Sequence, residues 1–293
     1  MTSTLPLLSS LWLHEPVAET AARAVDELGL PSADPSELAL AYTDIFLLNV
    51  PPYGTVFTHA FGELNGPEAQ RAAQAFETCG YHPPELGEVG APDHLGLWLG
   101  LLAHANATGL EAATALPDLL AWAPVCCLSV EREPAAHPFY RALAATTRDT
   151  LLARRQGQLT DYQQPFAISH GLAADDEVTL RDIVRFFLIP ARCGVYLSRA
   201  RLGQLAKTIG LRLPFGSRFG VAEALFTAAG EAEHIELLLR GLTAEVEAWA
   251  SEYRAWTTQF PAWRPGADAW LRRTAQAVQT LAAMRHLVEA EQA

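Results

Sequence analysis

The stretch that most constrains the fold is residues 90–108, GAPDHLGLWLGLLAHANAT. Between Leu95 and Leu102, five leucines and a tryptophan fall on every side of a helix rather than on one stripe. A helix that is apolar all round is buried on most of its circumference. Pro92 suits the first position of a helix, and Asp93 suits the first turn, where the helix dipole favours a carboxylate. The sequence therefore predicts a buried central helix that begins near Pro92.

Two interpretations of Asp93 and His94 stay open at this point. In the first, the pair is a helix start and a core histidine whose hydrogen bonds are satisfied. In the second, the pair supplies hydrogen-bonding groups to a binding site at the mouth of the core. Because His94 and Trp98 are four residues apart, their rings are predicted to stack on one helix face. Adjacent helical residues point about 100° apart, so no acid–base dyad of Asp93 with His94 is expected.

The rest of the chain predicts an all-α fold. Strand signals are nearly absent, because β-branched residues are sparse and no segment alternates cleanly. Asp34 before Pro35 predicts an N-cap and a first-position proline, and Gly29 ends the helix before them. The predicted helices cover residues 15–28, 35–46, 67–79, 92–108, 139–155, 178–189, 194–209, 221–229, 233–260 and 267–291, with a further one that begins at 116–120.

Domain organisation is predicted from one weakly periodic segment. Residues 157–174 are polar and contain proline and glycine, which favours a linker. We expect a helical domain over residues 1–160 and a helical C-terminal extension over residues 175–293. Long loops around Pro83 and Gly171 would allow a domain-swapped homodimer, so monomer and dimer both stay open.

The charge of the chain is lopsided. Residues 1–150 contain 5 arginines and 18 acidic residues, whereas residues 151–293 contain 16 basic and 15 acidic ones. The first half would repel nucleic acid and attract a basic peptide, although an acidic surface also serves solubility alone. Residues 183–222 carry seven basic residues and no acidic one. This segment is predicted to be a solvated face or one that docks on the acidic half, with an acidic partner or phosphate as the alternative.

The expected compartment is the cytoplasm. No apolar run is long enough to span a membrane, and the N-terminal apolar patch lacks the basic residue of a signal peptide, so no membrane insertion is expected. The four cysteines show no C-x-x-C spacing, which favours reduced, buried thiols.

Catalytic motifs are missing from the sequence. It contains no P-loop, no dinucleotide fingerprint and no G-x-S-x-G elbow. The nine histidines include no H-E-x-x-H motif and no pair spaced for a helical metal site. We therefore expect a protein that is not an enzyme, without catalytic residues, metal or cofactor.

Three stretches carry a resemblance to a known family. They are PPYGTVF at residues 51–57, PDHLGLWLGLLA at residues 92–103 and HPFYRALAATTRDTL at residues 137–151. Their order and spacing resemble the TorD/DmsD family of redox-enzyme maturation chaperones, over residues 35–155. The resemblance implies a cytoplasmic, all-helical bundle that binds the twin-arginine signal peptide of a molybdopterin-containing oxidoreductase until its cofactor is inserted. Residues 175–293 are similar to the tail of a longer branch of the family.

The resemblance also implies a binding site. The family's E-P-x-D-H hinge falls on residues 90–94, where Gly90 and Ala91 replace the Glu and Pro and only Asp93 and His94 match. Asp93 is the candidate acceptor for the guanidinium groups of the twin-arginine signal peptide, here called the leader. His94 is expected to fix the conformation of the loop at residues 90–94. The remaining candidate signal-peptide-binding residues are Phe46, Pro52, Tyr53, Phe57 and Trp98, for which plain core packing is the alternative.

Three functions follow as hypotheses. The first is a chaperone that binds the twin-arginine leader without turnover. The second is an accessory assembly protein whose arginine-rich C-terminal half docks on the mature catalytic subunit of the oxidoreductase. The third, a helical enzyme that binds a small molecule or nucleotide, has the least support from the residues.

Overall fold

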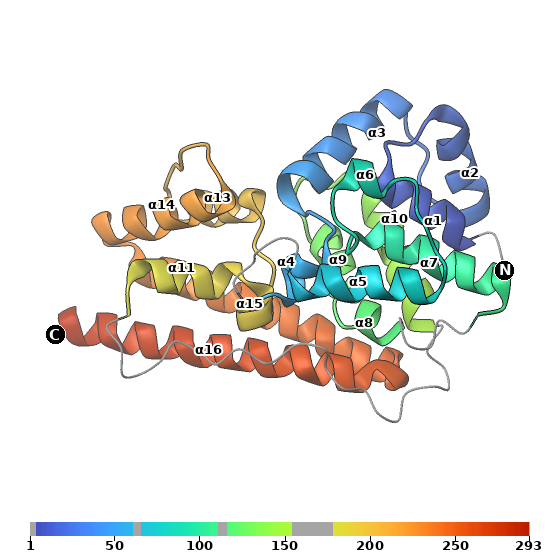
Figure 1. Ribbon diagram of the computed structural model, residues 1–293. Helices are drawn as coiled ribbons and strands as arrows, with labels where there is room; N and C mark the ends of the chain where they lie inside the picture. The colour runs from blue at the N-terminus through green and yellow to red at the C-terminus, as the bar shows by residue number, and fades with distance from the viewer. Residues whose placement is uncertain (1–3, 61–65, 111–115, 154–177, 293) are drawn as a thin grey trace. The chain divides into compact units, whose positions relative to one another are not determined.

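The computed structural model describes residues 4–60, 66–110, 116–153 and 178–292, and it divides into two compact units, Met1–Phe166 and Ala167–Ala293. Among the described residues no β-strand forms, which confirms the all-α prediction (Figure 1). The predicted linker at 157–174 lies outside the described residues. None of the described helices is long and apolar enough to cross a membrane.

The first unit is built around α7, Leu95–Thr108. Every residue from Leu95 to Leu102 is buried, as the all-round apolar pattern predicts. The helices of this unit that precede and follow α7 are α1 (Thr4–Leu13), α2 (Ala18–Leu28), α3 (Pro35–Tyr42), the π-helical turn η1 (Thr43–Asn49), α4 (Gly54–Thr58), α5 (Pro67–Thr78), α6 (Leu86–Val89), α8 (Leu116–Leu120), α9 (Ala123–Glu131) and α10 (Pro138–Ala153).

Helix α1 was not among the helices that the sequence predicts, and it packs closely against α7. The Ser9 hydroxyl donates to the Gly96 carbonyl oxygen at 2.7 Å. A Cβ atom on Gly96 would lie 2.5 Å from Leu13 Cγ, and one on Gly100 would lie 3.2 Å from Ser9 Oγ. Gly96 therefore lets α1 approach α7 at backbone distance, whereas a Cβ on Gly100 would first meet the Tyr81 hydroxyl.

Replacing Gly96 with alanine is expected to lower the free energy of unfolding by about 1 to 3 kcal/mol, because the added methyl group overpacks the contact with α1. The matched control is Gly203→Ala in α13 (Arg199–Thr208), where nothing lies within 4 Å of the added Cβ. That variant is expected to gain about 0.5 to 1 kcal/mol from helix propensity. Urea denaturation of both variants measures the difference. Equal effects would contradict the close packing of α1 on α7.

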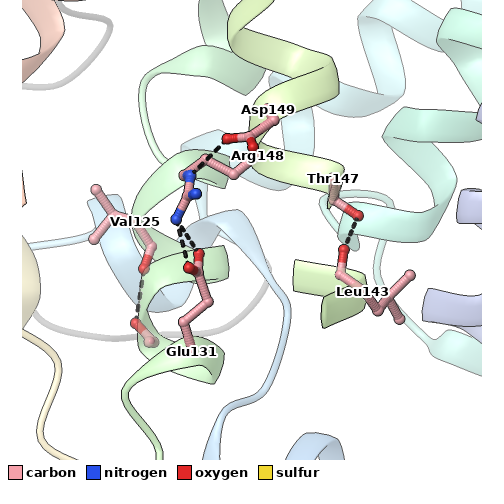
Figure 2. Close-up of polar contacts among 7 residues, drawn as sticks. Val125, Glu131, Leu143, Thr147, Arg148 and Asp149 are labelled. Atoms are coloured by element: carbon pink, nitrogen blue, oxygen red, sulfur yellow. Dashed lines mark hydrogen bonds and ion pairs between the residues drawn. The ribbon is translucent and has the colours of Figure 1, made fainter. Parts of the chain in front are cut away.

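An ion pair joins α9 to α10. Figure 2 shows Arg148 reaching from α10 to the Glu131 carboxylate on α9, with Nη1 at 2.5 Å from both oxygens, while Nε lies 3.1 Å from Asp149. In the same view the Thr147 hydroxyl donates to the Leu143 carbonyl oxygen at 2.8 Å. Thr147 also accepts a 2.9 Å hydrogen bond from Trp12 Nε1, which links α10 to α1. The third family motif therefore serves mainly to hold the bundle together.

The second unit contains a pair of long helices, α15 and α16, that pack side by side (Figure 1). Four tryptophans, Trp249, Trp256, Trp263 and Trp270, are buried in this unit. The helices of the unit are α11 (Leu180–Leu188), α12 (Pro190–Cys193), α13 (Arg199–Thr208), α14 (Arg218–Glu231), α15 (Ile235–Gln259), the 3-10 turn η3 (Pro261–Trp263) and α16 (Arg264–Gln292).

The predicted helix over residues 194–209 is wrong in its first turn. Gly194 has a φ of +79°, and a Cβ there would lie 2.8 Å from the Thr274 backbone nitrogen. The chain then runs extended to Ser198, whose side chain accepts from Arg201 N–H and starts α13. Close packing against α16 therefore overrides the local helix signal. All four cysteines are unpaired and buried, as expected.

Candidate functional site

The first two family motifs lie side by side in the structure. Gly54 N–H donates to the Asp93 carbonyl oxygen at 2.9 Å, and Leu95 N–H donates to the Pro52 carbonyl oxygen at 2.8 Å. These bonds form an antiparallel bridge between Tyr53 and His94. The bridge joins the start of α4 to the start of α7, so it fixes the entry of the central helix.

Asp93 is 1% exposed, and it lies before α7 rather than in its first turn. The prediction of a helix start at Pro92 is therefore wrong, because Pro92 and Asp93 form a turn and the extended His94 lies in the bridge. Asp93 Oδ2 accepts from Thr55 N–H at 2.8 Å and also from the Thr55 hydroxyl. The other carboxylate oxygen, Oδ1, is buried without a hydrogen-bond partner in the described structure.

His94 is the N-cap of α7. Its Nδ1 accepts from Gly96 N–H at 3.1 Å, so the ring caps the helix in its neutral form. Burial, together with a smaller contribution from the charge of His14, lowers the pKa of His94 to about 3. The predicted stacking on Trp98 is not among the ring contacts of the described residues, because the extended backbone of His94 directs its ring away from the helix face. The imidazole instead meets the Tyr53 ring edge-on at 4.9 Å.

Tyr53 is partly buried, and its hydroxyl donates to the Val89 carbonyl oxygen at 2.8 Å. Burial raises the pKa of Tyr53, and the nearby Asp93 charge raises it further. Phe57 is fully buried and stacks on Trp122 at 6.1 Å between ring centroids. Tyr53 thus lies at the edge of the site, whereas Phe57 supports the site from within.

A small pocket lies behind this hinge. Its cavity volume for the centre of a water molecule is about 10 Å³, which is on the order of one water molecule. Asp93 Oδ1, Glu68 Oε2 and Trp98 Nε1 are all buried without a hydrogen-bond partner among the described residues. The pocket is lined by Thr58, Glu68, Arg71, Asp93, Trp98, Asp118 and Trp122.

Acidic groups outnumber basic ones among the described residues of the pocket. Three carboxylates, those of Glu68, Asp93 and Asp118, face one guanidinium, that of Arg71. Burial raises the pKa of Asp118, although the charge of Arg71 acts in the opposite direction. A buried carboxylate without a partner is costly, so the pocket favours a cationic hydrogen-bond donor.

The remaining predicted site residues are placed away from this pocket. Phe46 is 2% exposed, and its ring contacts Trp12 at 4.8 Å, Tyr42 at 5.0 Å and Tyr140 at 5.3 Å. Pro52 is buried and acts through its carbonyl oxygen in the hinge. The structure therefore brings together Asp93, His94, Tyr53 and Pro52 at the hinge, with Trp98 beside Asp93 in the pocket.

Sequence reasoning missed Glu68, Arg71, Asp118 and Trp122. Glu68 and Arg71 are three residues apart on α5, and this spacing was the one local signal that the pair would meet. Asp118 and Trp122 come from α8 and the turn after it. No spacing in the sequence links them to Asp93, because the pocket forms only when the separate helices α4, α5, α7 and α8 pack together.

Comparison with known proteins gives one family match, which lies within the first unit. The family model described as nitrate reductase delta subunit matches residues 12–127, which contain the first two motifs, the hinge and every residue of the pocket. No curated protein and no solved structure matches the chain significantly. The match of residues 12–127 to the nitrate reductase delta subunit family supports the resemblance to the molybdoenzyme maturation chaperones that the TorD/DmsD motifs indicate.

Proposed function

We propose that this chain is a cytoplasmic chaperone that binds the twin-arginine leader of a molybdopterin-containing oxidoreductase and assists maturation of the catalytic subunit. The family supplies the class of client, a molybdoenzyme. The observation that carries leader recognition is the buried, unpartnered oxygen of Asp93 in a pocket with two further carboxylates and two tryptophans.

The chemistry of such a leader matches that of the pocket. A guanidinium group offers five N–H donors to carboxylates and stacks on indole rings. The peptide backbone around it offers carbonyl oxygens, which would accept from the unpartnered Trp98 Nε1. The excess of 13 acidic groups over residues 1–150 would steer a basic peptide towards this half of the chain.

The experiment is a calorimetric titration of the full chain with synthetic twin-arginine leaders, each beside its Lys-Lys counterpart. Because an ammonium group cannot reproduce the guanidinium fork, the Lys-Lys peptide is expected to bind about 10- to 100-fold more weakly. Raising the salt from about 50 to about 500 mM should weaken the twin-arginine complex several-fold. Equal affinity for both peptides would exclude guanidinium recognition.

A second candidate function rests on one surface of the second unit. Phe215, in the loop between α13 and α14, is 94% exposed. The Arg199 guanidinium lies 5.5 Å from the Phe215 ring, and that of Arg181 lies 5.8 Å from the Phe219 ring. An exposed aromatic ring among arginines is typical of a protein-binding hot spot, which favours docking of this loop on an acidic surface of the catalytic subunit.

The Phe215→Ser variant separates the two functions. It is expected to keep the affinity for the leader and to lower the yield of mature oxidoreductase in cells. The control is Leu287→Ser, which removes a 67% exposed apolar side chain from α16. Normal maturation by the Phe215→Ser variant would remove the docking role.

A further inference from the structure

Arg71 is the one cation among the described residues that line the acidic pocket. Arg71 lies on α5. Its Nη2 atom is 3.3 Å from Glu68 Oε1, and its Nε atom is 3.8 Å from Asp118 Oδ1. The Arg71 side chain is 31% exposed, whereas that of Glu68 is 9% exposed. Arg71 thus reaches into the pocket from its solvent side, and it bridges two helices without a bidentate contact to either carboxylate.

The pocket has no room for a second guanidinium. Its cavity volume of about 10 Å³ is on the order of one water molecule. The two carboxylate oxygens without partners, Asp93 Oδ1 and Glu68 Oε2, therefore cannot be reached by an outside arginine while Arg71 stays in place.

The Arg71 side chain is also partly exposed, so it can move out of the pocket. Long, partly exposed ion pairs contribute little to stability, because solvent screens them and an ordered side chain loses entropy. The flexible arginine stem can turn outwards into solvent without any change in the backbone. After such a turn, three carboxylates would remain with two tryptophan walls and no cation among the described lining residues.

We propose that Arg71 is an internal competitor: its guanidinium pairs with Glu68 and Asp118 at a pocket that also contains Asp93, and the arginine of a bound leader takes its place. The identity of the incoming ligand rests on the proposed function, whereas the pocket's preference for guanidinium does not. Competition of this kind keeps Glu68 and Asp118 paired in the free protein. It also weakens the binding of other cations, since any cation must displace Arg71 before it can bind in the pocket.

The first measurement uses the guanidinium ion itself on the full-length Arg71→Ala variant. About 10 mM guanidinium chloride is expected to raise the Tm of Arg71→Ala by a few degrees relative to sodium chloride at equal concentration, because the ion binds the vacated pocket of the native state. Wild type is expected to show no rise. The control is Arg23→Ala, which removes an arginine from an exposed pair with Glu27. Arg71→Gln is the second variant in case the alanine variant folds poorly.

The second measurement is leader affinity in the same variants. The twin-arginine leader is expected to bind Arg71→Ala about 5- to 10-fold more tightly than wild type, a gain of the size that relief of one competing contact gives. Arg23→Ala should leave the affinity unchanged. Weaker binding by Arg71→Ala, or the absence of a guanidinium effect on both Arg71 variants, would overturn the inference. A guanidinium effect on Arg71→Ala without leader binding by any variant would support the pocket and remove the proposed leader instead.

Discussion

Lowering the pH from about 7 to about 4.5 is expected to destabilise the wild-type chain by about 2 to 3 kcal/mol more than the His94→Asn variant. Burial lowers the pKa of His94 from 6.5 to about 3 in the folded state. Between these two values the unfolded chain binds a proton that the folded chain excludes. The contribution of neutral His94 to stability is therefore complete above about pH 6.5 and declines steadily towards pH 3.

Asparagine is the matched substitution because its side-chain oxygen can replace His94 Nδ1 as the acceptor for Gly96 N–H. Urea denaturation at a series of pH values gives the difference between the two chains, and carboxylates that titrate in both chains cancel. The control is His286→Asn, since the side chain of His286 is 82% exposed. Parallel pH profiles of wild type and His94→Asn would show that the histidine is not held neutral in the fold.

Removing the side chain of Asp93 is expected to lower the free energy of unfolding by about 3 kcal/mol. Asp93→Ala leaves the buried Thr55 N–H and hydroxyl without the acceptor that now serves both groups. Asp93→Asn keeps a carbonyl oxygen for Thr55 and loses only the charge, so it should cost about 1 kcal/mol. Urea denaturation separates the two values, and equal losses would mean that the charge rather than the acceptor stabilises the hinge.

The same two variants separate the structural role of Asp93 from its proposed role in binding. Both are expected to weaken leader binding by at least about tenfold, because neither presents a charged acceptor to a guanidinium. The control is Asp34→Asn, which also removes one negative charge but keeps an N-cap at the start of α3. A leader affinity that falls equally in Asp34→Asn would point to general charge attraction.

The parts of the fold that follow from local signals could be predicted from the sequence. The N-cap Asp34 with Pro35 starts α3, and its carboxylate accepts from Ser36 N–H at 2.8 Å. Gly29 ends α2 with a φ of +68°. The burial of α7 follows from its apolar residues alone. These features depend on residues within a few positions of one another.

The features that the sequence did not predict depend on distant partners. Helix α1 is a short, largely apolar segment without a clear helical stripe, and it packs closely against α7. Asp93 has a good helix-start pattern, yet pairing with Gly54 and Thr55 holds it outside the helix.

The residues of the candidate site also divide into those that the sequence motifs predicted and those that depend on the packing of distant segments. Asp93, His94 and Tyr53 were predicted from motifs that lie next to each other in the fold. Glu68, Arg71 and Asp118 were not predicted, because helices of different parts of the chain bring them together. Phe46 was predicted at the site from its aromatic character, and the structure packs it among the rings of α1, α3 and α10.

The central claim is that a leader arginine binds Asp93, and a double-mutant cycle tests it most directly. Calorimetry would give the affinities of wild type and Asp93→Asn for a twin-arginine leader and for its Lys-Lys counterpart. If the two groups meet, the losses are strongly non-additive, with a coupling energy of at least about 1.5 kcal/mol. If the two losses simply add, the leader's arginines bind elsewhere and the proposed site is wrong.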